Sequence, residues 1–292
     1  MSYKLSKNEM IIADSGSTKT TWRISNKEQK YLDVSTDGIN PYFQSSDDIN
    51  AIIKNQLLPK LSSEWFEALD VLHFYGAGCS NDEKIKSVIS GLKSGFEKWQ
   101  VHVDHDLLAS ARALLGNESG IACILGTGSN SCLYLNGKII ENIPSWGYMF
   151  GDFGSGAHIG KVFIQAYANN QFSSSLKKEL EAAGIDRETI LNQVYQKPLP
   201  NRYLASFSKI AGNFTHHDAI NELVIACFDK FFTHQVEIYT NYSQYEISFV
   251  GSISYHFSKQ LQEAAKRKNL KVGTTLKEPI NGLFNFHTNQ SI

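Results

Sequence analysis

Two short stretches of the chain combine glycine with small hydroxyl residues in a way suited to holding phosphate oxygens. The first, ADSGSTKT, spans residues 13–20, and the second, LGTGSN, spans residues 125–130. Glycine lets the backbone approach a ligand closely, and neighbouring N–H and hydroxyl groups can donate hydrogen bonds to oxygens. Asp14 cannot bind phosphate itself, but its carboxylate suits a metal ion that accompanies phosphate. The first stretch therefore indicates a phosphate-binding turn or, alternatively, an ordinary hairpin with a polar turn.

The first stretch looks like the end of a P-loop, but its spacing and its context both differ. With Lys19 as the P-loop lysine, glycine is required at positions 18 and 13, where the chain has Thr18 and Ala13. From Thr20 to Ser25 the side chains alternate with a period of two, which predicts a strand and not the helix that follows a P-loop. The segment is therefore predicted to be a β-hairpin.

The second stretch lies in a segment organised like the first. Residues 120–138 read as a buried strand, a turn of Gly, Thr and Ser, and a second strand. The turn glycines Gly16 and Gly126 are 126 − 16 = 110 residues apart. A hairpin repeated at this distance predicts two similar α/β halves, each presenting one such turn, although self-similarity this weak can also arise by chance.

The rest of the chain must position these turns with helices and further strands. Periodicity and end signals predict helices at about 46–58, from Asn81 to about 96, at 107–115 and repeatedly through 175–240. Further strands are predicted within 70–80, at 101–103, within 246–254 and at 270–272. The glycines around Asp152 do not form GxGxxG after a strand, so a Rossmann dinucleotide loop is not indicated.

Composition restricts the class of protein. The chain has 292 residues, which suggests about two domains, and its 42% hydrophobic and 20% charged residues are typical of a globular protein with an ample core. A net charge of -1 gives no electrostatic reason to expect nucleic acid or a membrane surface as partner. No apolar run reaches the ~18–20 residues of a membrane span, and the polar start MSYKLSKNE has no signal-peptide core, so a cytoplasmic protein is expected.

Together the motifs resemble those of the actin/hexokinase/heat-shock-chaperone ATPase superfamily, and within it the short bacterial members of the N-acetylglucosamine kinase family. ADSGSTKT resembles the first phosphate motif and LGTGSN the second. FVGSIS (249–254) resembles the adenosine motif, and WGYMFGDFGSGA (146–157) resembles a sugar-site motif. Each motif is weak alone, but the four follow the family's order, and the resemblance runs from about residue 10 to about residue 275.

The resemblance implies an α/β fold of two actin-like (ribonuclease H-like) domains, each a mixed β-sheet flanked by helices, around a central cleft. We expect one domain at 1–105, with residues 1–9 as a flexible lead-in. The other is expected at 106–292, with a helical insertion at 157–240 and with the last residues able to pack back on the first domain.

The resemblance also implies an activity: ATP-dependent phosphorylation of the 6-hydroxyl of N-acetylglucosamine or a close amino sugar, with Mg²⁺. Other acceptors, such as glucosamine or an anhydro-muramyl sugar, stay open, and so does a homodimer. The family's catalytic base is an aspartate after a strand, and Asp106 fits that position better than Asp104. An aspartate before Leu107 could also be a helix N-cap, and the two roles are compatible.

Binding residues follow from the same resemblance, position by position. Those expected at the ATP phosphates are Asp14, Gly16, Ser17, Thr18, Lys19, Thr20, Gly126, Thr127 and Gly128, with Asp14 holding Mg²⁺ through water. Those expected at adenosine are Gly212, Gly251 and Ser252. Those expected at the sugar are Asn40, Tyr42, Asp106, Thr127, Ser129, Asn130, Trp146, Gly147 and Asp152. The alternatives are an exposed solubilising role for Lys19, a plain turn at Asn40 and core packing for Trp146, whereas Asp152 has no partner in view from the sequence.

Two rival functions remain within this fold. One is an activator-type ATPase of 2-hydroxyacyl-CoA dehydratase or benzoyl-CoA reductase systems, which holds an iron–sulfur cluster between subunits through two cysteines each. Cys123 and Cys132 lie in predicted strands and read instead as small buried residues. The four cysteines, which also include Cys79 and Cys227, form no CxxC pair, so neither a zinc site nor a disulfide framework is predicted. The other rival is a non-enzymatic sugar sensor, but no basic helix-turn-helix precedes residue 10.

Overall fold

The computed structural model describes residues 9–16, 18–26, 30–62, 69–93 and 95–289. The chain divides into two compact units. Unit 1 comprises Met1–Gly116 together with Pro279–Ile292, and unit 2 comprises Asn117–Glu278.

Unit 1 is built on a five-stranded mixed sheet in the order β3-β2-β1-β4-β5. Its strands are β1 (Met10–Ser15), β2 (Lys19–Ser25), β3 (Tyr31–Asp37), β4 (Val71–Gly76) and β5 (Gln100–His105). The strands β1, β2 and β3 pair antiparallel, and β4 and β5 run parallel to β1. The hairpin predicted around the first glycine turn is therefore present, with Ser15 paired to Thr20 across the turn.

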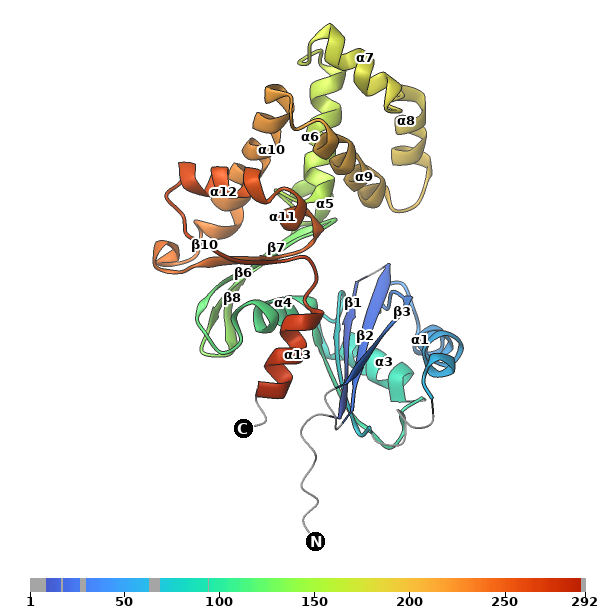
Figure 1. Cartoon of the computed structure of the whole chain (residues 1–292). Helices are drawn as coiled ribbons and strands as arrows, with labels where there is room; N and C mark the ends of the chain where they lie inside the picture. The colour runs from blue at the N-terminus through green and yellow to red at the C-terminus, as the bar shows by residue number, and fades with distance from the viewer. Residues whose placement is uncertain (1–8, 17, 27–29, 63–68, 94, 290–292) are drawn as a thin grey trace. The chain divides into compact units, whose positions relative to one another are not determined.

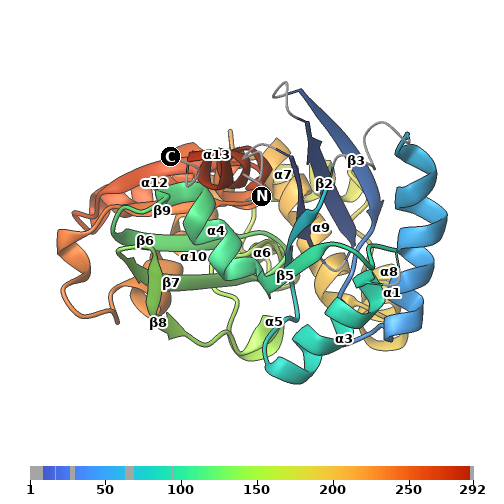
Figure 2. The same ribbon diagram turned by 90° about the horizontal axis from the view of Figure 1, so that it is seen from below.

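Helices cover both faces of this sheet. They are α1 (Ser46–Ile52), which continues as a π-helix (Ile53–Leu57) and a 3-10 turn (Leu58–Lys60), then α3 (Asp82–Lys93), α4 (Asp106–Leu115) and α13 (Ile280–Asn289). Alternation along β1 separates two cores: Ile11 and Ala13 join the core that contains residues of α1 and α3, whereas Met10 and Ile12 join the core that contains residues of α4 and α13. Figures 1 and 2 show these two helix pairs on opposite sides of the sheet.

The C-terminal helix α13 is held on unit 1 by specific contacts. Arg23 Nη1 on β2 donates a hydrogen bond of 2.6 Å to Asn281 Oδ1. A Cβ at Gly282 would clash with the backbone oxygen of Ala113, so only glycine lets α13 approach α4 this closely. The sequence placed a domain boundary after residue 105. In the structure α4 packs on β1, β4, β5 and α13, so unit 1 continues to Gly116.

Three histidine rings stack where α13 meets the sheet. His73 lies 5.0 Å from His102 and 3.9 Å from His287 between ring centroids, and His287 Nε2 is 2.8 Å from the hydroxyl of Tyr75. Burial, with the nearby positive groups, lowers the pKa of His73 to about 4 and that of His287 to about 2. Below pH 6.5 the unfolded chain therefore binds protons that the native state does not. The free energy of unfolding must then decrease as the pH is lowered.

Unit 2 repeats the sheet of unit 1. Its strands are β6 (Gly120–Leu125), β7 (Ser129–Leu135), β8 (Lys138–Ile143), β9 (Ile247–Val250) and β10 (Val272–Leu276). Their order is β10-β9-β6-β7-β8, with β6, β7 and β8 antiparallel and with β9 and β10 parallel to β6. Because the order and directions match those of unit 1 strand for strand, the predicted pair of similar α/β halves is confirmed.

Unit 2 carries most of the helices found among the described residues. They are α5 (Gly147–Phe150), α6 (Gly156–Ala168), α7 (Ser174–Ala182), α8 (Arg187–Gln196), α9 (Pro200–Asn213), α10 (Asp218–Phe231), α11 (Ser252–His256) and α12 (Ser258–Arg267), with a π-helix at Phe232–Val236 and a 3-10 turn at Tyr242–Gln244. Residues of α6, α10 and α12 share one core with alternate residues of β6. Figure 1 shows α7 and α8 at the end of the helical bundle far from the sheet of unit 2. Among the described residues, no helix has the length and apolar character that a bilayer crossing requires.

Candidate active site

The first glycine turn presents exposed groups between β1 and β2. The N–H of Gly16 donates a hydrogen bond of 3.0 Å to the backbone oxygen of Lys19, which closes the turn. Gly16, Thr18 and Lys19 are exposed, whereas Asp14, one residue before the end of β1, is half-buried. Ser17 lies outside the described residues. The exposed atoms of this turn are therefore available to a ligand.

Thr20, also expected at phosphate, is placed differently from its neighbours. It is fully buried, and its hydroxyl lies 2.7 Å from Ser15 Oγ and donates to the backbone oxygen of Asp37 at 3.1 Å. Ser15 Oγ in turn accepts a hydrogen bond from the N–H of Ile39. Thr20 thus stabilises the turn from within, and its buried hydroxyl is not placed to contact a ligand.

The second glycine turn is anchored to the start of α6. Gly126 N–H donates to the backbone oxygen of Gly128, and the N–H groups of Gly156 and Ala157 donate to the backbone oxygens of Gly126 and Thr127 at 2.8 and 3.1 Å. The first N–H groups of α6 are therefore used to hold the turn, not left open to a ligand. The side chain of Thr127 is exposed, and these hydrogen bonds hold the backbone that carries it.

Asp152 lies directly behind this turn. It is 8% exposed with a φ of 50°, and its Oδ1 accepts hydrogen bonds from Ser145 Oγ at 2.6 Å and from the N–H of Ser129 at 3.2 Å. A Cβ at Gly128 would lie 3.0 Å from its Oδ2, so the glycine makes room for the carboxylate. The partners of Asp152, which were not in view from the sequence, are therefore supplied by the second turn and by Ser145.

The residues around Asp152 differ in exposure. Trp146 is 75% exposed, so the alternative of core packing for this residue is wrong, and Gly147 beside it has a φ of 68° that favours glycine. Ser129 is buried, and its hydroxyl has no hydrogen-bond partner among the described residues. The Oδ1 of Asn130 accepts hydrogen bonds from Ser131 N–H and Asn142 Nδ2, both at 2.9 Å.

In unit 1, Asn40 and Tyr42 share one turn. Asn40 is buried, and its Oδ1 accepts a hydrogen bond of 3.0 Å from the N–H of Tyr42. Tyr42 is 58% exposed, with its hydroxyl 2.9 Å from Ser80 Oγ and Lys84 Nζ 5.1 Å from its ring centre. A Cβ at Gly78 would clash with Asn40 Oδ1. The turn interpretation is therefore right, and the turn also fixes an exposed aromatic ring.

Asp106 is the first residue of α4, directly after β5. The N-cap is His105, whose Nδ1 accepts a hydrogen bond of 3.2 Å from the N–H of Leu108, so the N-cap alternative for Asp106 was wrong. Burial raises the pKa of the Asp106 carboxyl, although a part of the residue stays exposed. The neighbouring His105 and then the backbone N–H of Leu107 partly oppose this rise. Asp104 instead pairs with Arg112 at 3.5 Å. A carboxylate with a raised pKa suits proton transfer near neutral pH.

A cavity of about 820 Å³ opens beside the second glycine turn, entirely within unit 2. Gly126 and Thr127 form part of its wall, and α9, α11 and α12 form much of the rest. Predicted adenosine residues Gly212 and Ser252 both line it. Its volume is that of a small-molecule site.

Three cationic side chains in this wall, two on α9 and Lys259 on α12, were missed by the sequence analysis. Arg202 and Lys209 on α9 line the cavity together with Ala205 and Gly212. Positions 202, 205, 209 and 212 follow the spacing of one helical face, which is a signal in the sequence. That signal alone does not say what the face contacts.

Comparison with known proteins places the chain. No protein-family model matches it, and no curated protein matches it. It is 37% identical to a solved structure, a putative N-acetylglucosamine kinase from Porphyromonas gingivalis, over 97% of this chain and 100% of that chain, with a TM-score of 0.91. The chain belongs to the N-acetylglucosamine kinase family. This membership supports a kinase-like phosphotransferase that uses ATP.

Two more distant structures share the fold. A putative N-acetylglucosamine kinase from Chromobacterium violaceum is 17% identical over 97% of this chain and 99% of that chain, with a TM-score of 0.69. MreB 5 of Spiroplasma citri, bound to AMPPNP, is 8% identical over 96% of this chain and 94% of that chain, with a TM-score of 0.54. The N-acetylglucosamine kinase family thus has the actin-like ATPase fold that the sequence predicted.

Gly251, which was expected at adenosine, does not line the cavity wall, although Ser252 does. Its role in this N-acetylglucosamine kinase family member is to hold the backbone next to the cavity. Its φ is 131°, and a Cβ there would clash with the backbone oxygen of Leu125 at the end of β6. Its N–H donates to the backbone oxygen of Leu276. Gly251 therefore lets β9 end against the strand that leads into the second turn.

The cysteines do not fit the rival activator-type ATPase. All four are buried and unbridged. Cys123 pairs in register with Ser131 and Cys132 with Ala122, so the two thiols point to opposite faces of the sheet. Burial raises the pKa of the Cys132 thiol to about 12 and also raises that of Cys123. Buried, protonated thiols are poor ligands for a cluster shared between subunits.

Proposed function

We propose that this protein is an ATP-dependent kinase that phosphorylates the 6-hydroxyl of N-acetylglucosamine or a close amino sugar. The observation that carries the proposal is the cavity of unit 2, because one wall is the phosphate-type turn at Gly126 and Thr127 and another carries Arg202 and Lys209. A nucleotide needs both a neutral pocket for its base and positive or N–H groups for its phosphates. The family relationship supports the same assignment.

In this proposal ATP lies in the unit 2 cavity. The adenosine end would lie near Gly212 and Ser252, and the phosphates would lie at Thr127. The family resemblance also assigns Thr18 to the phosphates. The side chain that would hold Mg²⁺ is Asp14, because one half-buried carboxylate suits an ion that keeps several waters and phosphate oxygens as ligands. Bound Mg²⁺ would neutralise charge on the phosphate oxygens during transfer.

The sugar would be oriented by polar and aromatic groups that the family resemblance assigns to it. Asp152, already fixed by Ser145, would accept hydrogen bonds from sugar hydroxyls, and exposed Trp146 would flank the N-acetyl group. In unit 1 the exposed ring of Tyr42, held by its turn, would contact the sugar, with Asn40 beside it. A flat ring suits the apolar face of a sugar.

Asp106 would act as the base. It would take the proton from the sugar 6-hydroxyl as that oxygen attacks the γ-phosphorus, the bond to the bridging oxygen of ADP breaks, and ADP leaves. Its raised pKa favours this role, because a base with a pKa closer to the working pH holds the transferred proton more firmly. The products are ADP and the sugar 6-phosphate.

A coupled ADP-release assay over a panel of hexoses and amino sugars tests the proposal. We expect the highest kcat/KM with N-acetylglucosamine. Lys209→Ala should raise the KM for ATP about 10- to 100-fold, because a lost hydrogen bond to a charged group costs ~1.5–3 kcal/mol. The matched control is Lys178→Ala on exposed α7, which should leave the KM unchanged. Absence of sugar-stimulated ADP release with every amino sugar would overturn the kinase assignment.

A further inference from the structure

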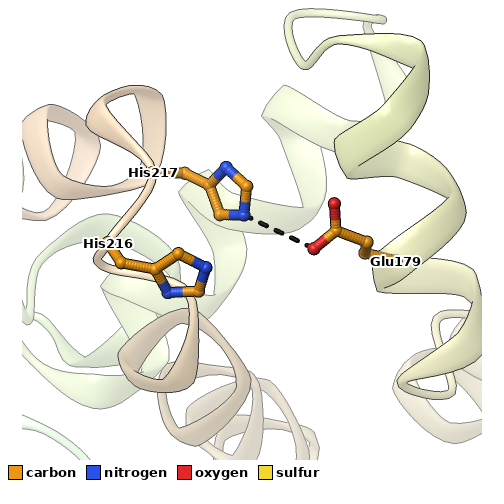
Figure 3. Close-up of side chains that lie close together, drawn as sticks. All are labelled: Glu179, His216 and His217. Atoms are coloured by element: carbon orange, nitrogen blue, oxygen red, sulfur yellow. Dashed lines mark ion pairs between the residues drawn. The ribbon is translucent and has the colours of Figure 1, made fainter.

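A second group of side chains that could bind a ligand lies outside the lining of the nucleotide cavity. His216 and His217 occupy the turn between α9 and α10, and Glu179 lies on α7. One ligand atom from each, two imidazole nitrogens and a carboxylate oxygen, fall within 4.8 Å of one another. Figure 3 shows His217 directing a ring nitrogen toward the Glu179 carboxylate, with the His216 ring beside them.

One nitrogen atom of this group lacks a hydrogen-bond partner among the described residues. This atom, His217 Nε2, is buried. Glu179 Oε2 lies 3.5 Å from it, which is long for an N–H···O hydrogen bond. A buried polar atom without a partner is costly, so an atom that bridges the nitrogen and the carboxylate would stabilise the arrangement.

The distances suit a tetrahedral metal ion. Zinc–nitrogen and zinc–oxygen bonds of ~2.0–2.2 Å place neighbouring ligand atoms about 3.3–3.5 Å apart at the tetrahedral angle. The separation of His217 Nε2 and Glu179 Oε2, 3.5 Å, already fits this requirement. The third candidate ligand is a ring nitrogen of the exposed His216, which lies within 4.8 Å of both of these atoms.

We propose that Glu179, His216 and His217 form a zinc site that ties α7 to the α9–α10 turn. Two imidazoles with one carboxylate suit zinc, whereas Mg²⁺ and Ca²⁺ prefer oxygen ligands throughout. Three protein ligands leave the fourth position for water. None of these ligands is Asp14, the residue proposed above to hold Mg²⁺.

The turn that carries the two histidines also borders the nucleotide cavity. Thr215, directly before the two histidines, lines the cavity, and its hydroxyl donates a hydrogen bond of 3.1 Å to the backbone oxygen of Gly212. Zinc binding must be measured without ATP, because ATP lies in this cavity in the proposal above and itself chelates divalent metals.

The test is a zinc titration of tag-free protein by calorimetry, repeated by competition with a chromophoric chelator. We expect one zinc per chain in the wild type and at least a tenfold weaker affinity in Glu179→Gln and His217→Gln. The His217 side chain makes no capping hydrogen bond to α10, so its replacement removes no cap. The control Glu181→Gln removes a carboxylate two residues further along α7, one that bonds to Tyr167, and should bind zinc like the wild type.

A second readout separates ligation from folding. Zinc should raise the melting temperature of the wild type and of Glu181→Gln, because it binds the native state, and should leave that of Glu179→Gln unchanged. Co²⁺ in place of zinc should give the visible absorption of a tetrahedral site, and His216→Asn should abolish it. Equal zinc affinity in the wild type and in a His216→Asn, His217→Gln double variant would overturn the proposal.

Discussion

Replacing Asp106 with asparagine separates a structural role from a catalytic one. The variant keeps the shape of the side chain but removes its charge and its capacity to accept a proton. His105 supplies the N-cap of α4, so the helix start does not depend on Asp106. The only helix contribution lost is the favourable position of a negative charge in the first turn, worth ~0.3–1 kcal/mol. Because burial disfavours the charged carboxylate, asparagine also relieves a cost, and the free energy of unfolding should change by less than about 1 kcal/mol.

Turnover should respond far more strongly than stability. A general base contributes ~10²–10⁴-fold to the rate, which is about 2.7–5.4 kcal/mol of activation free energy at ~1.36 kcal/mol per factor of ten. The assay is ADP release at saturating ATP and sugar, with sugar binding measured by calorimetry and unfolding measured in urea. Asp104→Asn, whose parent carboxylate pairs with Arg112, is the matched control and should keep kcat near that of the wild type. A kcat for Asp106→Asn within about threefold of wild type would refute this role, as would an equal loss in Asp104→Asn.

Three further outcomes follow from the described contacts. Asp152→Ala should raise the KM of the sugar at least tenfold and leave the KM of ATP within about threefold, since the carboxylate would hold sugar hydroxyls; equal rises in both would point to a collapsed turn. Gly251→Ala should lower the free energy of unfolding in urea by at least about 2 kcal/mol, because a Cβ there would clash with Leu125 at a φ of 131°; a loss below about 0.5 kcal/mol would contradict this. Lowering the pH from 7 to 5 should reduce the free energy of unfolding by about 2 kcal/mol for each of His73 and His287. Their lowered pKa values keep both residues neutral in the native state, whereas in the unfolded chain they are protonated below pH 6.5. The same pH dependence in a variant with both histidines changed to glutamine would contradict this.

The hairpins and the duplicated sheet could be predicted because their signals are local. Strand alternation after Thr20 and the glycine turns at Gly16 and Gly126 depend on neighbouring residues only, and the structure pairs β1 with β2 and β6 with β7 as expected. The cap of α4 could not be predicted in this way. Histidine is not among the residues that favour the N-cap position, so Asp106 was taken as the capping candidate in place of His105.

The site was predictable only where one segment determines it. The exposure of Trp146 and the enclosure of Asp152 depend on how the glycine-rich segment folds against the second turn, which no periodicity reports. Arg202 and Lys209 reach the cavity because α9 lies opposite α11 and α12, elements some fifty residues away in the chain. Contacts between distant segments are set by packing of the whole unit, and a single sequence carries little information on them.

The most direct test of the central claim is the identity of the product. The protein, ATP, Mg²⁺ and N-acetylglucosamine are incubated together, and the sugar product is examined by phosphorus–proton correlation NMR alongside the amount of ADP formed. We expect N-acetylglucosamine 6-phosphate in equimolar amount with ADP, with coupling from phosphorus to the two protons on carbon 6. Release of ADP at a rate independent of the sugar, with no sugar phosphate formed from any amino sugar, would contradict it.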